Sequence, residues 1–424
     1  MIRVIGQSIF LLLALLLIIE GILGPQFAPK NLATLFIWIH YRGLLVLVLL
    51  FLGNYFCTFC PMVLLRNMAR YFVVPPFSWP RFLQKKWLGI LLFSIILFSY
   101  EYFDIWASPL KTALLTIAIF LFSLGTDLLF KKASFCKYLC PIGQFNFLSS
   151  TLSPQVIKVK DHSVCATCTT YECLLGNNQK KLSGKLGCEL DLFLPQKVGN
   201  MDCTFCMECI QACPSNNVAI NLRLPGIELQ DERHRAGIGK FSKRHDLQYL
   251  ILIFTFGALL NALGMVGPAY AFQEFIMTQF KLENDFFPLL ILFIFFLGCL
   301  PIIAKKTIPS RLISTFLPLG FGIWLAHYSF HFLTGLFTFV PILQEMMGIP
   351  GQFPLQWMGV PESIVFSIEM GFLFLGFIIS LGTHYQLRYK SNETMSKSTI
   401  FWQVALSIFA LWILSLPMEM RGMA

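Results

Sequence analysis

Nine apolar stretches constrain this chain more than any other feature, because a helix needs about 20 apolar residues to cross a bilayer. Hydrophobic residues make up 56% of the 424 positions and charged residues only 13%, which excludes a disordered or coiled-coil chain and is too apolar for a soluble fold. Backbone polar groups in lipid are satisfied within helices, so we expect an all-α polytopic membrane protein with about nine transmembrane helices. The expected spans lie near residues 6–24, 33–56, 87–106, 110–130, 247–268, 286–304, 311–336, 361–383 and 400–417.

Lys and Arg residues are concentrated in alternate loops between these stretches. If the N-terminus is cytoplasmic, 27 of the 32 Lys and Arg residues fall on the cytoplasmic side. Since cytoplasmic loops carry an excess of positive charge, we expect this orientation, in the inner (plasma) membrane of a cell. The net charge of +10 then reflects topology and affinity for anionic membrane lipid, and we expect no nucleic-acid partner. The five exceptions are Lys30, Arg42, Lys111, Lys281 and Arg421.

Most of the 13 cysteines lie in a polar insert between the fourth and fifth stretches. We therefore expect three parts: an N-terminal membrane domain (1–130), a cytoplasmic insert (131–246) and a C-terminal membrane domain (247–424). Twelve cysteines fall in pairs or short runs, whereas Cys299 stands alone in an apolar stretch and is expected to be a buried thiol. Disulfides rarely persist in the cytoplasm, so the grouped cysteines favour metal ligation.

The most specific motif is the run Cys203, Cys206, Cys209, Cys213, Pro214. This is the C-x2-C-x2-C-x3-C-P run of bacterial ferredoxins, in which three thiolates bind one [4Fe-4S] cluster and the fourth binds a second cluster. Tetrahedral zinc instead prefers two separated cysteine pairs. The motif therefore predicts iron through these four cysteines.

A second cluster needs its own ligands, and Cys165, Cys168, Cys173 and Cys188 lie upstream. Their spacing is x2, x4 and x14, with no proline after Cys188, so this run departs from the ferredoxin pattern. In the simplest pairing, one cluster is bound by Cys188, Cys203, Cys206 and Cys209. The other cluster is bound by Cys165, Cys168, Cys173 and Cys213. Which of Cys173 and Cys188 crosses over stays open, and a zinc knuckle is the alternative.

A third group is split between two distant places that look like an internal repeat. Cys57 and Cys60-Pro61 follow the second stretch, and Cys136 and Cys140-Pro141 follow the fourth. Both stretches run inward, so the four thiols would lie at one membrane depth and could hold a third cluster. A redox-active dithiol pair, a Cu(I) site and inert packing are the alternatives.

These motifs together resemble the membrane polyferredoxins, which include NapH-type subunits of nitrate respiration, NosR-type proteins and CcoG-type oxidase-assembly proteins. The resemblance covers about residues 1–250. It implies [4Fe-4S] clusters on these cysteines and electron transfer between the quinone pool and redox partners of a respiratory or cyclic electron-transfer chain. For the CcoG type, it implies reduction of a metal during assembly. Two features depart from the pattern: the unequal spacing of the membrane-edge pairs, and the stretches after residue 247.

The C-terminal part offers histidines as its main clue. His327 and His331 are four residues apart and so lie on one helix face, and His40 is expected at a similar depth. A quinone or haem role competes with polar bonding between helices. Glu101 and Asp104 are either quinol proton acceptors or solvated interfacial groups. Six basic residues in 215–246 favour either a docking surface for an acidic partner or a membrane-facing surface: Arg223, Arg233, Arg235, Lys240, Lys243 and Arg244.

We therefore predict a membrane-bound iron-sulfur protein that relays single electrons, with a ferredoxin-like two-cluster insert. The alternative is an assembly factor or copper reductase in which the clusters feed the membrane-edge thiols. A third possibility is a transporter-like C-terminal half whose conformational state is sensed by the clusters. Walker loops and dinucleotide glycine patterns are absent from the sequence, so nucleotide chemistry is not expected.

Overall fold

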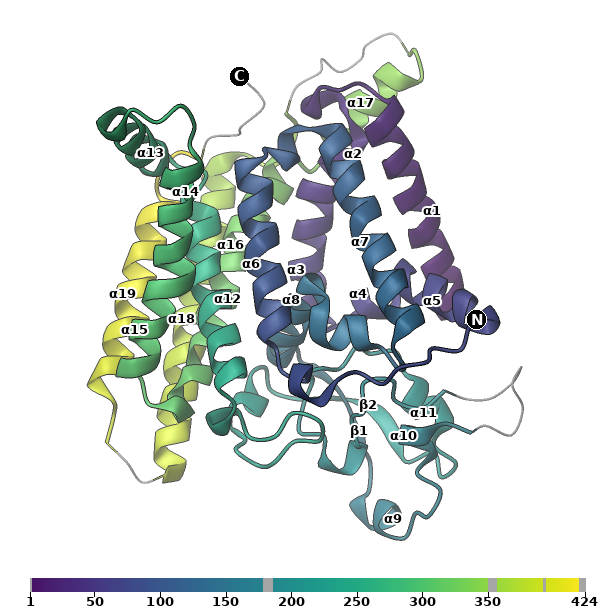
Figure 1. The fold of residues 1–424 in the computed structure, drawn as a ribbon. Helices are drawn as coiled ribbons and strands as arrows, with labels where there is room; N and C mark the ends of the chain where they lie inside the picture. The colour runs from purple at the N-terminus through teal and green to yellow at the C-terminus, as the bar shows by residue number, and fades with distance from the viewer. Residues whose placement is uncertain (1, 178–185, 350–356, 392–393, 419–424) are drawn as a thin grey trace. The chain divides into compact units, whose positions relative to one another are not determined.

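A computed structural model describes residues 2–177, 186–349, 357–391 and 394–418 (Figure 1). The chain is mostly helical, at 70%, with a single two-stranded sheet among these residues. It forms two compact units. Unit 1 comprises Met1–Leu11, Val48–Leu92 and Phe122–Leu250, and unit 2 comprises Leu12–Leu47, Phe93–Leu121 and Ile251–Ala424.

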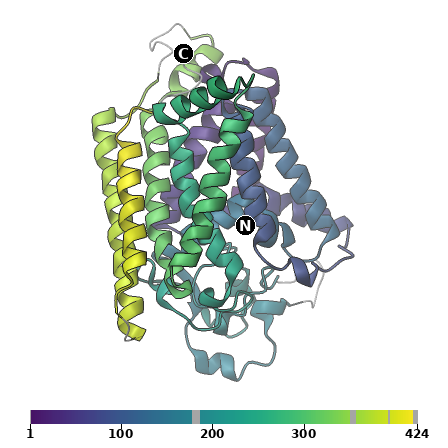
Figure 2. The ribbon, with the colours of Figure 1, turned by 60° about the vertical axis from the view of Figure 1, so that its left-hand side comes forward.

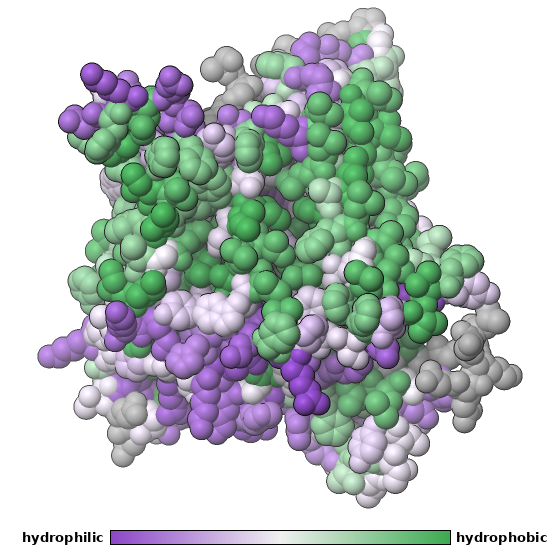
Figure 3. All heavy atoms as spheres, in the orientation of Figure 1, coloured by the Kyte–Doolittle hydropathy of each residue, from purple (hydrophilic) through white to green (hydrophobic). Residues whose placement is uncertain are grey.

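Seven helices in the described part of the chain are long and apolar enough to cross a membrane, which confirms the expectation of a multi-pass helical membrane protein. Hydrophobic side chains cover the faces of α1 (Ile2–Leu23) and α7 (Pro109–Leu129) that Figure 3 shows. A bent pair, Ser310–Thr334 with Phe339–Met346, makes an eighth span if it is counted as one. The seven are Ile2–Leu23, Leu32–Phe51, Pro109–Leu129, His245–Leu263, Phe286–Thr307, Glu362–Ser391 and Lys397–Leu414.

Two expected spans are shorter than the sequence suggested. The third, α6 (Trp87–Tyr102), has only 16 residues. The second ends at Phe51, because Gly53 has a φ of 88° that a helix cannot contain, and a separate short helix, α4, follows. Arg421, one of the five expected outer charges, lies outside the described residues.

Unit 1 is built around the polar insert and the segments that carry the cysteines. Strand β1 (Gln155–Val159) pairs antiparallel with β2 (Val218–Leu222), with Gln155 opposite Leu222 and Val159 opposite Val218. This pairing joins the two ends of the cysteine-bearing insert. The helices that lie wholly in unit 1 are α4 (Tyr55–Thr58), α5 (Pro61–Phe72), α8 (Pro141–Ser149), α9 (His162–Ala166), α10 (Glu172–Leu175) and α11 (Glu208–Ala212).

Unit 2 centres on α16 (Leu317–Thr334), nearly all of which is buried, packed against α18 (Glu362–Ser391). Figure 2 shows α18 beside α19 (Lys397–Leu414). The other helices wholly in this unit are α2 (Leu32–Thr34), α13 (Gly267–Phe280), α14 (Phe286–Phe293), α15 (Leu300–Thr307) and α17 (Phe339–Met346). Five helices contribute residues to both units. They are α1, α3 (Tyr41–Phe51), α6, α7 and α12 (His245–Leu263).

The prediction that Cys299 is buried is wrong. Cys299 ends the π-helical segment Ile294–Cys299, and its side chain is exposed. This segment belongs to the candidate span Phe286–Thr307, whose surface would face lipid. A thiol behaves as a small apolar group, so exposure to lipid carries no polar penalty.

Candidate functional site

The run from Cys203 to Cys213 forms a loop that leads into the short helix α11. Three non-glycine residues at this loop, Asp202, Phe205 and Met207, have left-handed backbone conformations with φ of 61°, 52° and 62°. Each such residue costs about 1–2 kcal/mol and persists only when its surroundings hold it. Left-handed residues in a loop turn successive N–H groups toward one side and form concavities that bind anions, including at iron-sulfur sites.

Contacts from other segments of unit 1 hold this loop in place. The Asn54 amide donates to the Cys203 carbonyl at 2.9 Å, and the Thr58 hydroxyl donates to the Phe205 carbonyl at 2.8 Å. The Phe205 side chain is fully buried and lies 5.6 Å from the Tyr55 ring, centroid to centroid. The α4 segment thus supports the loop on both its polar and its apolar side.

The first thiol set consists of Cys188, Cys203, Cys206 and Cys209. The thiols of Cys206 and Cys209 both interact electrostatically with those of Cys188 and Cys203. The Leu192 N–H points at the Cys188 sulfur at 3.4 Å. The loop and the distant Cys188 therefore bring four thiols near one another.

The second thiol set consists of Cys165, Cys168, Cys173 and Cys213. Cys173 interacts with the other three thiols, and Cys165 interacts with Cys213 and Cys168. Asn217 links the two chain segments, since its backbone N–H lies 3.3 Å from the Cys213 sulfur and its side-chain amide 3.4 Å from the Cys165 sulfur. In this arrangement Cys188 belongs to the first set and Cys173 to the second.

The third thiol set consists of Cys57, Cys60, Cys136 and Cys140, from the two repeated motifs. The Cys136 thiol interacts with Cys140 and Cys60, and the Cys140 thiol interacts with Cys57 and Cys60. Each motif therefore contributes two thiols to one cluster of side chains.

The repeated Cys-Pro dipeptides explain how the third set is built. Proline favours the first turn of a helix, so α5 begins at Pro61 and α8 at Pro141, with Cys60 and Cys140 at the N-cap positions. The Gly143 N–H donates to the Cys140 sulfur at 3.1 Å, whereas the Val63 N–H donates to the Cys60 carbonyl at 3.2 Å. Helix N-termini and their free N–H groups stabilise thiolates.

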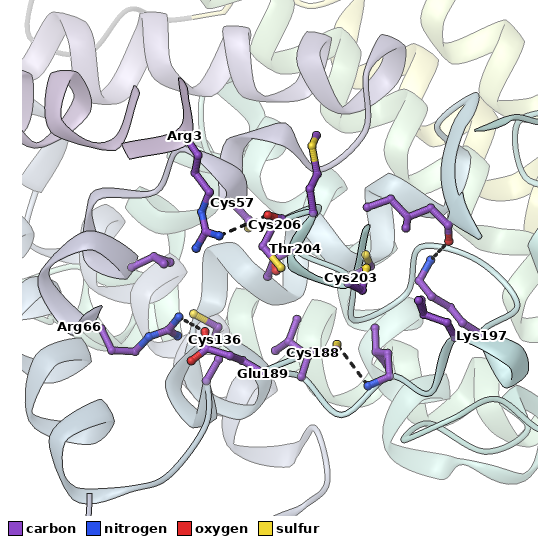
Figure 4. Close-up of a pocket in the computed structure, with 18 residues that line it drawn as sticks. Arg3, Cys57, Arg66, Cys136, Cys188, Glu189, Lys197, Cys203, Thr204 and Cys206 are labelled. Carbon is purple, nitrogen blue, oxygen red and sulfur yellow. Dashed lines mark hydrogen bonds and ion pairs between the residues drawn. The ribbon is translucent and has the colours of Figure 1, made fainter. Parts of the chain in front are cut away.

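The first and third sets lie next to each other. The Cys57 thiol interacts with Cys203, and Arg66 interacts with both Cys136 and Cys206. One cavity is lined by cysteines from both sets (Figure 4). The first and second sets are joined through α11, which carries Cys209 and ends one residue before Cys213. The order of the sets is therefore third, first, second.

Buried charges surround the cavity between the first and third sets. Arg66 forms ion pairs with Glu189 and, at 3.8 Å, with Asp127, and its side chain is only 3% exposed. Arg3 pairs with Glu208 and donates to the Cys206 carbonyl at 3.3 Å. The guanidinium of Arg66 is thus a fixed positive charge close to the sulfurs of both sets.

Several thiols are protonated at neutral pH when they carry no metal. Burial raises the pKa of Cys206 to about 12 and that of Cys173 to about 11. Cys168 differs, because the N–H groups of Tyr171 and Thr170 lower its pKa. Metal binding at the buried thiols must therefore release protons.

The described residues contain no group of three or more His, Cys, Asp or Glu side chains close enough to share a single metal ion. A zinc knuckle or a Cu(I) site needs such convergence on one ion. A cubane cluster binds each cysteine through a different iron atom, so its ligands can lie farther apart.

The three candidate histidines lie in unit 2. Both His40 ring nitrogens face backbone carbonyls, of Leu35 at 3.3 Å and Leu336 at 3.2 Å, which favours polar bonding between helices over ligation. The rings of His327 and His331 lie 4.9 Å apart, centroid to centroid. His331 lines a pocket that also contains Trp38, Arg42, Tyr100, Glu101 and Trp357.

Arg42, one of the five expected outer charges, organises this pocket. Its guanidinium lies over the rings of Trp38, Tyr100 and Tyr328 at 4.3, 4.7 and 5.2 Å from their centroids. Trp38 lies four residues before Arg42 on the same span, but Tyr100 and Tyr328 come from distant helices, so their contacts with Arg42 have no spacing signal in the sequence. Glu101 is buried at the pocket, whereas Asp104 adopts a left-handed conformation just after α6.

The expectation of a basic surface in 215–246 is only partly met. Arg223 and Arg235 are buried and bond the Glu228 carboxylate at 2.5 and 3.1 Å, so neither is available to a partner. Arg244 pairs with Asp246 at 2.6 Å, and Arg233, although exposed, pairs with Asp231. Lys240 and Lys243 are also exposed, so three of the six charges lie at the surface and three serve the interior of the insert.

Searches of protein-family models, curated proteins and solved structures found no match to this chain. The resemblance to membrane polyferredoxins stays a prediction that rests on the cysteine motifs.

Proposed function

We propose that this protein is a membrane-bound iron-sulfur electron carrier with three [4Fe-4S] clusters, one on each thiol set. The observation that carries the proposal is the grouping of twelve cysteines into three sets of four that follow one another in space. Each cluster, when bound, would accept and pass on one electron at a time. The residues 131–246 would form the ferredoxin-like insert, on the cytoplasmic side of a protein with about nine spans.

The chain's own residues would tune this relay. N–H groups point at sulfurs in all three sets, through Leu192, Asn217 and Gly143. Hydrogen bonds to cluster sulfurs favour the more negative, reduced form and raise the reduction potential. Burial of Cys203 and Cys209 limits solvent access at the first set. The four thiols of the second set are all partly exposed.

We propose quinone as the partner on the membrane side, at the pocket of unit 2. Aromatic rings of Trp38, Tyr100 and Trp106 line this pocket and suit a flat ring. Arg42 offers a hydrogen-bond donor to a quinone oxygen, and Glu101 offers a site for a proton released by quinol. A haem held between His40 and the other histidines is less well supported, because both His40 nitrogens face backbone carbonyls instead of an open ligand position.

Iron content tests the proposal directly. Anaerobically purified protein should contain about 12 iron atoms and as many acid-labile sulfides per chain, four for each of three cubes. Electron paramagnetic resonance of the dithionite-reduced sample should show interacting cubes, and a haem spectrum from the same sample would reveal any haem. About eight iron atoms would confine clusters to the insert and leave the third set as free thiols.

The runner-up function is an assembly factor or copper reductase that uses the third set. The specific observation in its favour is that Cys57, Cys60, Cys136 and Cys140 are neighbours, since thiols are ligands that Cu(I) prefers. It predicts about one copper per chain at these thiols, about eight iron atoms, and no sustained turnover with quinol analogues.

Removing the charge of Arg66 should make the clusters beside it harder to reduce. Loss of a unit charge at an effective dielectric of about 20 changes the energy of an added electron by roughly 1–3 kcal/mol. For a one-electron couple this is a fall of roughly 50–130 mV. A redox titration of Arg66→Met, followed by paramagnetic resonance, would measure it. Arg233→Met, which removes an exposed charge paired only with Asp231, should leave the potentials unchanged.

A further inference from the structure

One face of α18 carries an unusual series of buried polar side chains. Glu369, Ser380, His384 and Arg388 are between 0% and 3% exposed. The last three are spaced four residues apart and so share a face, and this face is the one turned toward α16 and α19. Ionisable groups inside a membrane are costly and usually mark a path for ions or protons.

The helix α18 crosses α16 very closely at two glycines. A side-chain carbon at Gly376 would lie 2.7 Å from the Pro318 carbonyl oxygen and 3.1 Å from the Gly322 backbone, so only glycine fits. Ser329 lies seven residues after Gly322, and Glu369 lies seven residues before Gly376. Since the two helices run antiparallel through this crossing, Ser329 and Glu369 fall at the same level on facing helices.

A second polar group lies on the other side of the crossing. The Ser380 hydroxyl donates to the Thr315 carbonyl at 2.5 Å, and the Gln403 amide of α19 donates to the Ser380 and Thr315 hydroxyls at 2.9 and 3.1 Å. The Gln403 side chain also lies near the His384 ring, without a hydrogen bond to either ring nitrogen, and Arg388 is the charged neighbour of His384. Ser380, Thr315, Gln403 and His384 are therefore one buried cluster.

Several atoms of these groups have no hydrogen-bond partner within the described protein. They are Glu369 Oε1, Ser329 Oγ, Gln403 Oε1, both ring nitrogens of His384 and both terminal nitrogens of Arg388. Buried polar atoms are nearly always satisfied, and where the protein supplies no partner, internal water does. Donors and acceptors that need water therefore occur on both sides of the glycine crossing.

We propose that the α16–α18–α19 bundle contains a hydrated proton-transfer path in which Glu369 and His384 are the protonatable relay groups. A proton would add to the Glu369 carboxylate from water at its end of α18. It would pass through water to the polar cluster 11 residues away, about 16 Å along the helix, and bind a free His384 nitrogen as another proton leaves the ring to water near Arg388. Each step moves one proton between oxygen or nitrogen atoms, and no electron is transferred.

The groups around the path and the close helix crossing suit protons better than other solutes. Glu369 interacts electrostatically with the Glu362 carboxylate, and His384 with the Arg388 guanidinium. In the part of the chain that the structure describes, no cation pairs with Glu369 and no carboxylate pairs with Arg388. The close glycine crossing leaves no room for a hydrated metal ion or an organic solute, whereas a proton can pass between side-chain atoms and single water molecules.

Proton flux in liposomes tests this path. The full chain would be reconstituted with a pH-sensitive dye inside, and a potassium diffusion potential set with valinomycin would drive protons. The wild type should conduct protons well above empty liposomes, and Glu369→Gln should lower the rate about tenfold or more. His384→Ala should lower it similarly. Glu274→Gln and His162→Ala, which remove exposed groups elsewhere, are the matched controls and should conduct as the wild type does.

Folding of the variants is checked by gel filtration and by iron content, which the proposal expects to be unchanged. A second readout is the infrared carboxyl band that Glu369→Gln removes, which should shift in D2O because the path is hydrated. Wild-type flux no greater than that of empty liposomes would overturn the proposal, and so would undiminished flux in folded Glu369→Gln. The path lies wholly in unit 2, so it stands or falls independently of the electron relay.

Discussion

Replacing both Cys57 and Cys140 with serine should stop a quinol analogue from reducing the clusters of the insert, while those clusters remain assembled. The two substitutions remove one thiol from each half of the third set, and a serine hydroxyl is a poor iron ligand. Iron should fall by about four atoms per chain. Rapid-mixing absorbance would follow reduction by quinol, and dithionite would show that the remaining clusters still accept electrons.

Cys299→Ser is the matched control for this experiment. Cys299 is exposed and belongs to none of the thiol sets, so its loss should change neither iron content nor quinol-linked reduction. Normal reduction kinetics in the double variant would contradict a relay through the third set. Loss of bound copper without loss of iron would instead support the assembly function.

The spacing of cysteines carried most of what the sequence could predict about the site. Pro214 after Cys213 suggested that this thiol serves another set, and in the structure Cys213 lies beside Cys165 and Cys173. Spacing is informative here because ligands of one cluster are drawn from a short loop. The order of the sets depends instead on tertiary contacts such as Cys57 with Cys203, which no local pattern encodes.

Hydropathy predicted the helical membrane class but not the helix ends. The second span stops at Phe51 although the expected span continues to Phe56, because Gly53 turns the chain.

Charge patterns were less informative still. The basic residues of 215–246 suggested a surface, yet Arg223 and Arg235 are interior groups, because their partner Glu228 lies in the same insert. Pairing of a charge depends on the fold, and the sequence shows only that the charge exists.

Glu228→Ala should destabilise the insert more than any other single change outside the cysteines. The Glu228 carboxylate accepts the Asn200 N–H at 2.6 Å and bonds Arg223 and Arg235, all buried. It thereby holds the segment that leads into Cys203. Removing one partner of a buried ion pair leaves an uncompensated charge and costs about 3–5 kcal/mol. Asp231→Ala, which breaks the exposed pair with Arg233, should cost at most about 1 kcal/mol.

Acid should have the same effect on the wild type. Burial alone would raise the pKa of Glu228, but the two guanidiniums and the Asn200 N–H outweigh it and hold the pKa below its ordinary value of 4.5. A lowered pKa in the folded state stabilises the protein above pH 4.5, and this contribution is lost as pH falls through the folded value.

Hydrogen exchange of β1 and β2 amides in detergent would measure both the effect of Glu228→Ala and the effect of acid on the wild type. After correction for the intrinsic exchange rate, protection should fall below pH 4.5 in the wild type. In Glu228→Gln, which has no charge to lose, protection should be lower at neutral pH and should depend less on acid, and an acid response equal to that of the wild type would show that other carboxyls govern it.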